Sequence, residues 1–121
     1  ILVFKIGGTD SLPPKPQLAE KRLAPPPLTA SAEDVEEGRY LYGRYCGVCH
    51  GDAVHSAGVL PDLRYSTIPH DEEQFANVVL GGALSEKGMV SFNSVLDEES
   101  LEKLRAYIIA RANEDQEIYG Q

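Results

Sequence analysis

Cys46-Gly47-Val48-Cys49-His50 is the stretch of this sequence that decides how the chain folds. It has the form Cys-x-x-Cys-His, which is the attachment signature of a c-type haem. Two thiols one helical turn apart can reach the two vinyl groups on one edge of a porphyrin and form thioethers. The adjacent histidine then lies under the iron and can bind it. We therefore expect one covalent haem c, attached through Cys46 and Cys49, with His50 as an iron ligand.

Two other kinds of site use a Cys-x-x-Cys pair. A redox-active dithiol expects a βαβ context, whereas the sequence around Cys46 has a helical pattern. A structural zinc ion takes four ligands, and the chain has only two cysteines. His50, His55 and His70 could complete a mixed zinc site only in an unusual arrangement. The sequence favours haem over both alternatives.

Met89 is the expected second ligand of the iron, because a thioether opposite a histidine raises the reduction potential of a haem used for electron transfer. It is the single methionine of the chain. It lies in the segment Lys87-Gly88-Met89-Val90-Ser91-Phe92, which predicts a loop able to fold over a haem. A core methionine would instead lie on an apolar helical face. His70 and His55 are the rival ligands.

The segment from Gly58 to Arg64 is expected to support His50 from the second shell of the site. A ligating histidine usually donates its other ring N–H to a backbone carbonyl or a similar acceptor, which fixes the orientation of the ring. Pro61 would hold this segment rigid, although it could also be an ordinary loop proline. We expect Arg64 to pair with a haem propionate, the alternative being a simple surface arginine.

Composition limits the kinds of partner. The chain has 121 residues, 42% of them hydrophobic, and a formal net charge of −8. Such acidity argues against nucleic acid as a partner and is compatible with a partner that presents a basic patch. No apolar run is long enough to span a membrane. The N-terminal residues lack the order of regions found in a signal peptide, so we expect a processed protein or a piece of a longer one.

The first thirty residues read as two segments that precede the helical domain. Residues 1–8 predict a short strand that ends in a glycine turn and needs pairing partners elsewhere. Residues 9–30 contain six of the eight prolines, which predicts an extended, proline-rich linker. Residues 31–121 would form the haem domain.

Three main helices are expected in that domain, which makes the fold class all-α. The first should begin at Ser31, the second near Asp71 and the third at Asp97, each with a polar capping residue and acidic residues in its first turn. The third should run to about Asn113. Their apolar faces would be formed by these residues: Val35, Gly38, Tyr42 and Tyr45 on the first, Phe75, Val78 and Val79 on the second, and Leu101, Leu104, Tyr107 and Ile108 on the third.

From residue 35 to residue 113, about two-thirds of the chain, the sequence resembles class I cytochromes c. Gly38-x-x-x-Tyr42 is similar to the small-residue and aromatic pair on the first helix of that family. Leu104-x-x-Tyr107 is similar to its counterpart on the last helix. The cysteine–histidine motif, the proline and the methionine also follow in the order of the family. The resemblance implies three helices around one haem, with the first and last helices in close contact.

Residues 41–46, 58–64 and 88–92 resemble more closely the C-terminal cytochrome domain of quinohaemoprotein alcohol dehydrogenases. Those enzymes join a β-propeller that binds pyrroloquinoline quinone (PQQ) and calcium to a haem domain through a proline-rich linker. Residues 1–8 are then similar to the last strand of the propeller. The propeller itself lies outside this sequence, so no quinone-binding or calcium-binding residue can be assigned here.

The function expected from these observations is electron transfer, since the sequence shows no nucleophile–base pair and no convincing pair of catalytic carboxylates. The chain is therefore not expected to be an enzyme by itself. The resemblance implies a periplasmic domain that accepts electrons from a PQQ-dependent dehydrogenase domain and passes them to a soluble redox protein or a quinone. The alternatives are a freestanding periplasmic cytochrome c and a haem sensor or peroxidase with an open iron site.

Overall fold

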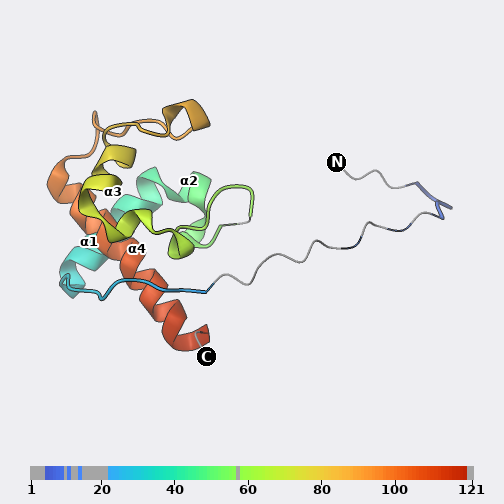
Figure 1. The fold of residues 1–121 in the computed structure, drawn as a ribbon, viewed down its shortest axis with the longest axis horizontal. Helices are drawn as coiled ribbons and strands as arrows, with labels where there is room; N and C mark the ends of the chain where they lie inside the picture. Colours follow the sequence, from blue (N-terminus) through green and yellow to red (C-terminus); the bar gives the residue numbers. More distant parts are fainter. Residues whose placement is uncertain (1–4, 10, 12–13, 15–21, 57, 120–121) are drawn as a thin grey trace.

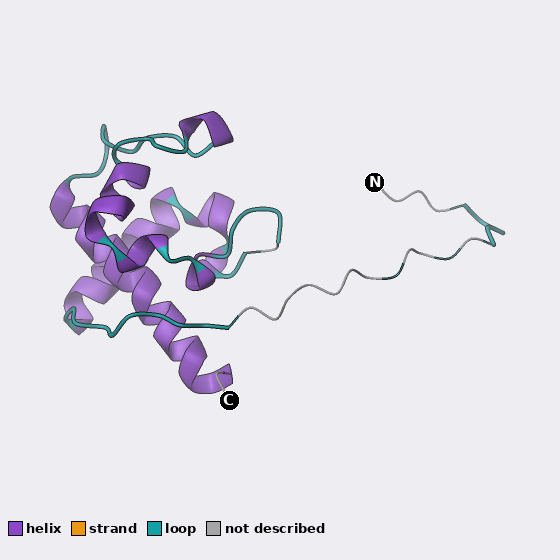
Figure 2. Cartoon of the chain, in the orientation of Figure 1, coloured by secondary structure: helices purple, strands orange, loops and turns teal. Residues whose placement is uncertain are grey.

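The computed structural model describes residues 5–9, 11, 14, 22–56 and 58–119, and all regular structure within them is helical (Figure 2). The four α-helices are α1 (Ala32–Tyr45), α2 (Gly47–His50), α3 (Glu72–Val79) and α4 (Glu98–Tyr119). Short 3₁₀ turns connect them: η1 (Asp52–Val54), η2 (Leu63–Tyr65), η3 (Ile68–His70) and η4 (Ser85–Lys87). The predicted all-α class is confirmed.

The three longer helices begin where their capping residues predict. The backbone N–H of Asp34 donates to Ser31 Oγ at 3.1 Å at the start of α1. Asp71 accepts from the N–H of Gln74 at 2.7 Å at the start of α3, and Asp97 accepts from the N–H of Ser100 at 2.8 Å at the start of α4. These bonds satisfy N–H groups that have no partner within the helix.

The last helix is longer than the sequence indicates, because α4 continues past Asn113 to Tyr119. Long-range contacts hold the additional turns. Asp115 is buried and accepts from Arg64 Nη1 at 2.7 Å, and Gln116 Nε2 donates to the carbonyl of Leu23 at 3.1 Å. The expected end at Asn113 was wrong, since tertiary packing rather than a local stop signal sets the end of this helix.

The helices α1 and α4 cross closely in the centre of the molecule (Figure 1). Gly38 makes this approach possible, because a Cβ at that position would lie 1.9 Å from the carbonyl oxygen of Lys103. One turn further along α1, the ring of Tyr42 lies 5.4 Å from that of Tyr107 between the ring centroids. This is the contact that the glycine–aromatic pattern predicts.

A single apolar core lies between these helices, α3 and the turn that follows α2. Its buried members are Tyr42, Val54, Phe75, Val79, Leu96, Leu101, Leu104, Tyr107 and Ile108. Within the described part of the chain, no helix is both long enough and apolar enough to cross a membrane.

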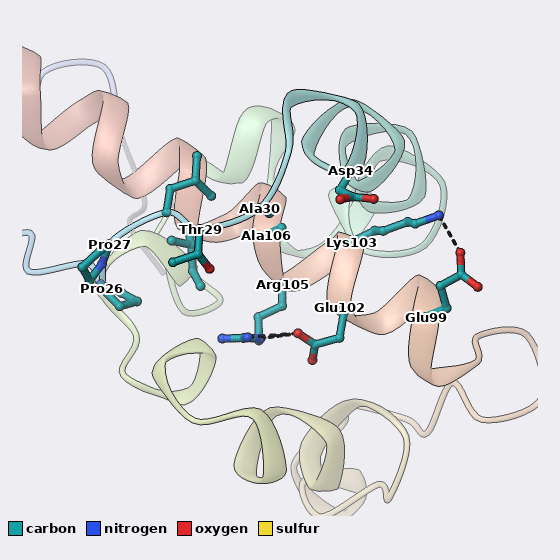
Figure 3. Close-up of a pocket in the computed structure, with 12 residues that line it drawn as sticks. Pro26, Pro27, Thr29, Ala30, Asp34, Glu99, Glu102, Lys103, Arg105 and Ala106 are labelled. Carbon is teal, nitrogen blue, oxygen red and sulfur yellow. Dashed lines mark hydrogen bonds and ion pairs between the residues drawn. The ribbon is translucent and has the colours of Figure 1, made fainter.

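The described end of the proline-rich segment, residues 22–30, lies against α4. Asn113 Nδ2 donates to the carbonyl of Pro26 at 2.9 Å, next to the bond from Gln116 to Leu23. A groove of about 450 Å³ is lined by residues 26–30 and by side chains of α4, among them Glu102 and Arg105 (Figure 3). This end of the segment is docked on the helical domain, and the linker itself stays a prediction.

The N-terminal strand expected over residues 1–8 falls partly outside the described residues and stays a prediction. The turn expected at its end is present, since the N–H of Gly8 donates to the carbonyl of Lys5 at 3.0 Å. Gly7 occupies that turn with a φ of 77°, a value that glycine tolerates readily.

Candidate haem site

The motif lies on α2, a single helical turn that continues the chain directly from α1. Cys46 forms the joint between the two helices, and its carbonyl accepts from the N–H groups of Cys49 at 3.1 Å and His50 at 2.9 Å. Residues three apart on a helix share a face. Both thiols are free, with Cys46 half-buried and Cys49 exposed. The structure therefore presents two unpaired thiols at the spacing that covalent haem attachment requires.

The raised pKa of the Cys46 thiol argues against a redox-active dithiol. Burial raises the pKa of its thiol to about 12, and the neighbouring Cys49 adds to this effect. Dithiol oxidoreductases depend on the opposite shift, because the thiolate is the nucleophile and a lowered pKa makes it available at neutral pH. A thiol protonated in this way is a poor catalyst of disulfide exchange.

The imidazole of His50 is held by the segment that contains Pro61. Its Nδ1 atom lies 3.1 Å from the carbonyl oxygen of Pro61. A carbonyl oxygen can only accept, so Nδ1 carries a proton in this contact, and in a neutral imidazole the lone pair is then on Nε2. A neutral imidazole with this tautomer is suited to bind a metal through Nε2. The contact is the one expected of a ligating histidine and its second shell.

The turn that follows His50 is conformationally strained and was not predicted. Gly51 has a φ of 86°, and a Cβ there would lie 1.9 Å from the carbonyl oxygen of His55. Val54 is fully buried with a φ of 70°, which is rare for a β-branched residue. The hydroxyl of the buried Tyr42 donates to the carbonyl of Gly51 at 2.9 Å and ties the turn to α1. Such strain persists only where surrounding contacts fix the backbone.

Met89 lies in the loop between η4 and α4 and is partly buried against the core. This loop is anchored to the end of α3, because Ser91 Oγ donates to the carbonyl of Leu80 at 2.5 Å. It also approaches the motif: the ring of Phe92 packs edge-on against that of Tyr45, the residue before Cys46, with 6.3 Å between the centroids. The fold therefore brings the loop of Met89 to the end of α1 from which the motif begins.

Arg64 is bound to two carboxylates of the protein. Its Nε and Nη2 atoms donate to Asp62 at 2.9 and 2.6 Å, and its Nη1 atom donates to Asp115 at 2.7 Å. The bonds to Asp62 are the main reason that the pKa of Arg64 is raised above its ordinary value. A guanidinium has five N–H donors, so two are left for another acceptor. Pairing with a haem propionate stays a prediction.

The other two histidines do not form a metal site with the cysteines. His55 Nε2 lies 3.0 Å from Asp115 Oδ2, and His70 is exposed at the end of η3. Across residues 5–9, 11, 14, 22–56 and 58–119, no three histidine, cysteine, aspartate or glutamate side chains are grouped so that they could hold a metal ion. The mixed zinc site therefore has no donor set in this part of the chain.

The residues of this region fit a haem, both in the ligand groups that they offer and in the apolar side chains that they expose. Two thiols, an imidazole with a free Nε2 and a thioether are available on neighbouring elements. The segments that carry these groups, and the segment that supports His50, also expose apolar side chains: Val48, Val59 and Val90 are 92%, 93% and 59% exposed. Exposed apolar side chains on segments that present metal-binding groups indicate that an apolar group completes the surface.

Comparison with known proteins agrees with this geometry. A family described as cytochrome c oxidase, cbb3-type, subunit III matches residues 33–108, which is more than half of the chain. The chain belongs to this family of cytochrome c domains. Membership implies one covalent haem c and the helical fold described above.

Two similar proteins are much larger than this cytochrome c domain. It is 42% identical over 95% of its length to the quinohemoprotein alcohol dehydrogenase ADH IIB of Pseudomonas putida, of which it covers 17%. It is 40% identical over 94% of its length to the dehydrogenase subunit of a quinone-dependent alcohol dehydrogenase of Gluconobacter oxydans, of which it covers 15%.

A solved structure gives the same result. The quinohemoprotein alcohol dehydrogenase ADHIIG of Pseudomonas putida HK5 matches 96% of this chain with 37% identity and a TM-score of 0.74, and the match covers 16% of that enzyme. The sequence resemblance to the cytochrome region of quinohaemoprotein alcohol dehydrogenases is confirmed.

Proposed function

We propose that this chain is an electron-transfer domain that accepts electrons from a PQQ-dependent alcohol dehydrogenase domain and passes them to a downstream redox protein or a quinone in the periplasm. By itself the domain would carry electrons and catalyse no reaction on an alcohol. Similarity to the dehydrogenases named above supports the identity of the donor. The net charge of −8 supports a downstream partner with a basic surface.

The observation that carries this proposal is the bond between His50 and Pro61 directly beside two free thiols. Cys46 and Cys49 would hold the haem covalently, and His50 would bind its iron through Nε2. Met89 would take the opposite position, which closes the site to other ligands. The haem supplies one-electron chemistry when bound. The contact of His50 with Pro61, and the anchoring of the Met89 loop through Ser91, would limit the movement of these two side chains when the bound haem gains or loses an electron.

A test of the proposal begins with the purified chain made in a host that attaches haem c. We expect a c-type haem spectrum in both redox states, and rapid reduction by a PQQ-dependent alcohol dehydrogenase turning over an alcohol. Failure to bind haem covalently would contradict the proposal. A haem that binds and is not reduced by such an enzyme would refute the proposed donor only.

The two alternatives predict different results. A haem sensor or peroxidase has an open iron position, so its reduced form would bind carbon monoxide rapidly in the unmodified protein. A freestanding cytochrome c would be encoded with a secretory signal directly before this sequence, whereas a fused domain would be preceded by propeller repeats. Inspection of the reading frame upstream of Ile1 therefore distinguishes a freestanding cytochrome c from a fused domain.

A further inference from the structure

Asp115 is the one charged residue that is buried among those the structure describes, with 2% of its surface exposed. A buried carboxylate is costly unless it is paired and hydrogen-bonded. Its side chain accepts hydrogen bonds from Arg64 Nη1 at 2.7 Å and Arg111 Nη2 at 3.4 Å, and His55 Nε2 lies 3.0 Å from its Oδ2 atom. None of these interactions was expected, because the helix that carries Asp115 was predicted to end before it.

One of these partners, Arg64, connects Asp115 to the segment that supports His50. Arg64 donates two hydrogen bonds to Asp62, from Nε and Nη2, and a third to Asp115 from Nη1. Asp62 directly follows Pro61, whose carbonyl oxygen lies 3.1 Å from His50 Nδ1. A planar guanidinium held at two sides restricts the backbone next to it. The bond between Arg64 and Asp115 therefore links α4 to the segment that carries the Pro61 carbonyl.

The other two partners connect Asp115 to the strained turn after His50. His55 ends that turn, and its Nε2 atom lies 3.0 Å from the Asp115 carboxylate. Arg111, one helical turn before Asp115, donates from Nε to the carbonyl of Ala53 at 3.4 Å. Ala53 has a φ of 49°, so its backbone needs such external contacts to keep this conformation. Asp115 thus contacts both the turn that follows His50, through His55, and the segment that contains Pro61, through Arg64.

We propose that Asp115 is a positioning residue for the haem-binding histidine. It joins the turn after His50 and the segment of Pro61 to α4, and so maintains the hydrogen bond that orients the imidazole. The proposal rests on the proposed haem-binding function. It adds that a buried carboxylate at the far end of the sequence, with no direct contact to His50, controls the geometry of that ligand.

The test is the rate at which the His50 Nδ1 proton exchanges with water, measured by NMR in the reduced, haem-bearing chain. In Asp115→Ala we expect exchange about tenfold faster than in the unmodified protein, the factor that corresponds to losing a hydrogen bond of ordinary net strength. Asp115→Asn should give an intermediate rate, because its amide oxygen can still accept from Arg64. Glu117→Gln removes an exposed charge from the same part of α4 and should leave the rate unchanged.

Arg64→Lys provides an independent variant if Asp115→Ala does not fold. A lysine keeps the charge but cannot bind Asp62 and Asp115 together as a planar fork does, so exchange should again be faster. Unchanged exchange in Asp115→Ala, or in Arg64→Lys where the alanine variant is unfolded, would overturn the proposal. Equal acceleration in Glu117→Gln would also overturn it, because charge alone would then account for the effect. An unmodified chain without haem would refute the proposed function instead.

Discussion

At the scale of single residues, Tyr42 joins the core to the haem-binding motif. Its side chain is buried between α1 and α4, and its hydroxyl donates to the carbonyl of Gly51, the residue after His50. Burial is the main reason that the pKa of Tyr42 is raised well above its ordinary value. The folded protein therefore keeps this phenol neutral at a pH at which the unfolded chain would ionise it.

We predict that this raised pKa makes the haem-bearing protein less stable in alkali. The contribution of neutral Tyr42 to the free energy of unfolding is complete below about pH 10 and is lost as the pH rises towards the folded-state pKa. Tyr42→Phe should lack this part of the slope and should lose about 1 kcal/mol at neutral pH, because the carbonyl of Gly51 loses its donor. Urea unfolding between about pH 8 and pH 11 measures both effects.

The matched control is Tyr40→Phe, since Tyr40 is 68% exposed on the same helix. It should keep the alkaline slope of the unmodified protein. A slope that is the same in Tyr42→Phe and in the unmodified protein would show that other groups cause the loss of stability.

Other residues show how far the sequence alone leads. Cys46, Cys49, His50 and Met89 were identified because a haem needs those chemical groups at known spacings. Asp115 could not be identified in this way, because its role depends on Arg64 and His55, which are more than fifty residues away in the sequence. Its only local context is a polar stretch that reads as the end of a helix.

At the scale of the elements, the contact between α1 and α4 fixes the position of the haem-binding motif, because the motif directly follows α1. Helix starts could be predicted because a capping side chain acts within one turn of its own position. The length of α4 and the strained turn at residues 51–55 could not, since tertiary contacts override local preference at both places.

Gly38→Ala tests that crossing. The added methyl group would overlap the carbonyl of Lys103, so α1 and α4 must move apart. We expect the free energy of unfolding to fall by about 2–3 kcal/mol, the upper part of the range for overpacked cores. Thermal or urea unfolding of the haem-bearing protein gives the value.

Gly43→Ala on the same helix is the control, because nothing lies within 4 Å of the added atom. It should be neutral or stabilise the protein by up to about 1 kcal/mol through better helix propensity. Equal losses from the two substitutions would mean that helix propensity, rather than close contact, explains the requirement for glycine at position 38.

At the scale of the whole molecule, the docked segment extends the domain towards the N-terminus. The sequence indicated a linker up to residue 30, because proline favours extended backbone and prevents regular hydrogen bonding. It could not show that residues 22–30 are fixed to α4, since the bonds come from the side chains of Asn113 and Gln116, which are 87 and 93 residues away in the sequence. Structurally, these residues act as part of the haem domain.

Truncation tests this boundary. A chain that begins at Arg22 should be as stable as the full chain, whereas one that begins at Ser31 should lose about 1–3 kcal/mol of unfolding free energy through its lost hydrogen bonds and apolar contacts. Urea unfolding of the three haem-bearing chains measures the difference. Equal stability in all three would show that residues 22–30 contribute nothing to the domain and act only as a linker.

The near-infrared absorption of the ferric protein, before and after Met89→Leu, is the measurement that tests the central claim most directly. A closed site with His50 and Met89 as ligands predicts a c-type haem spectrum with the near-infrared band of methionine-ligated ferric haem. In Met89→Leu the covalent haem should remain and that band should vanish. An unmodified protein that carries haem, lacks the band and binds carbon monoxide rapidly when reduced would contradict a closed electron-transfer site.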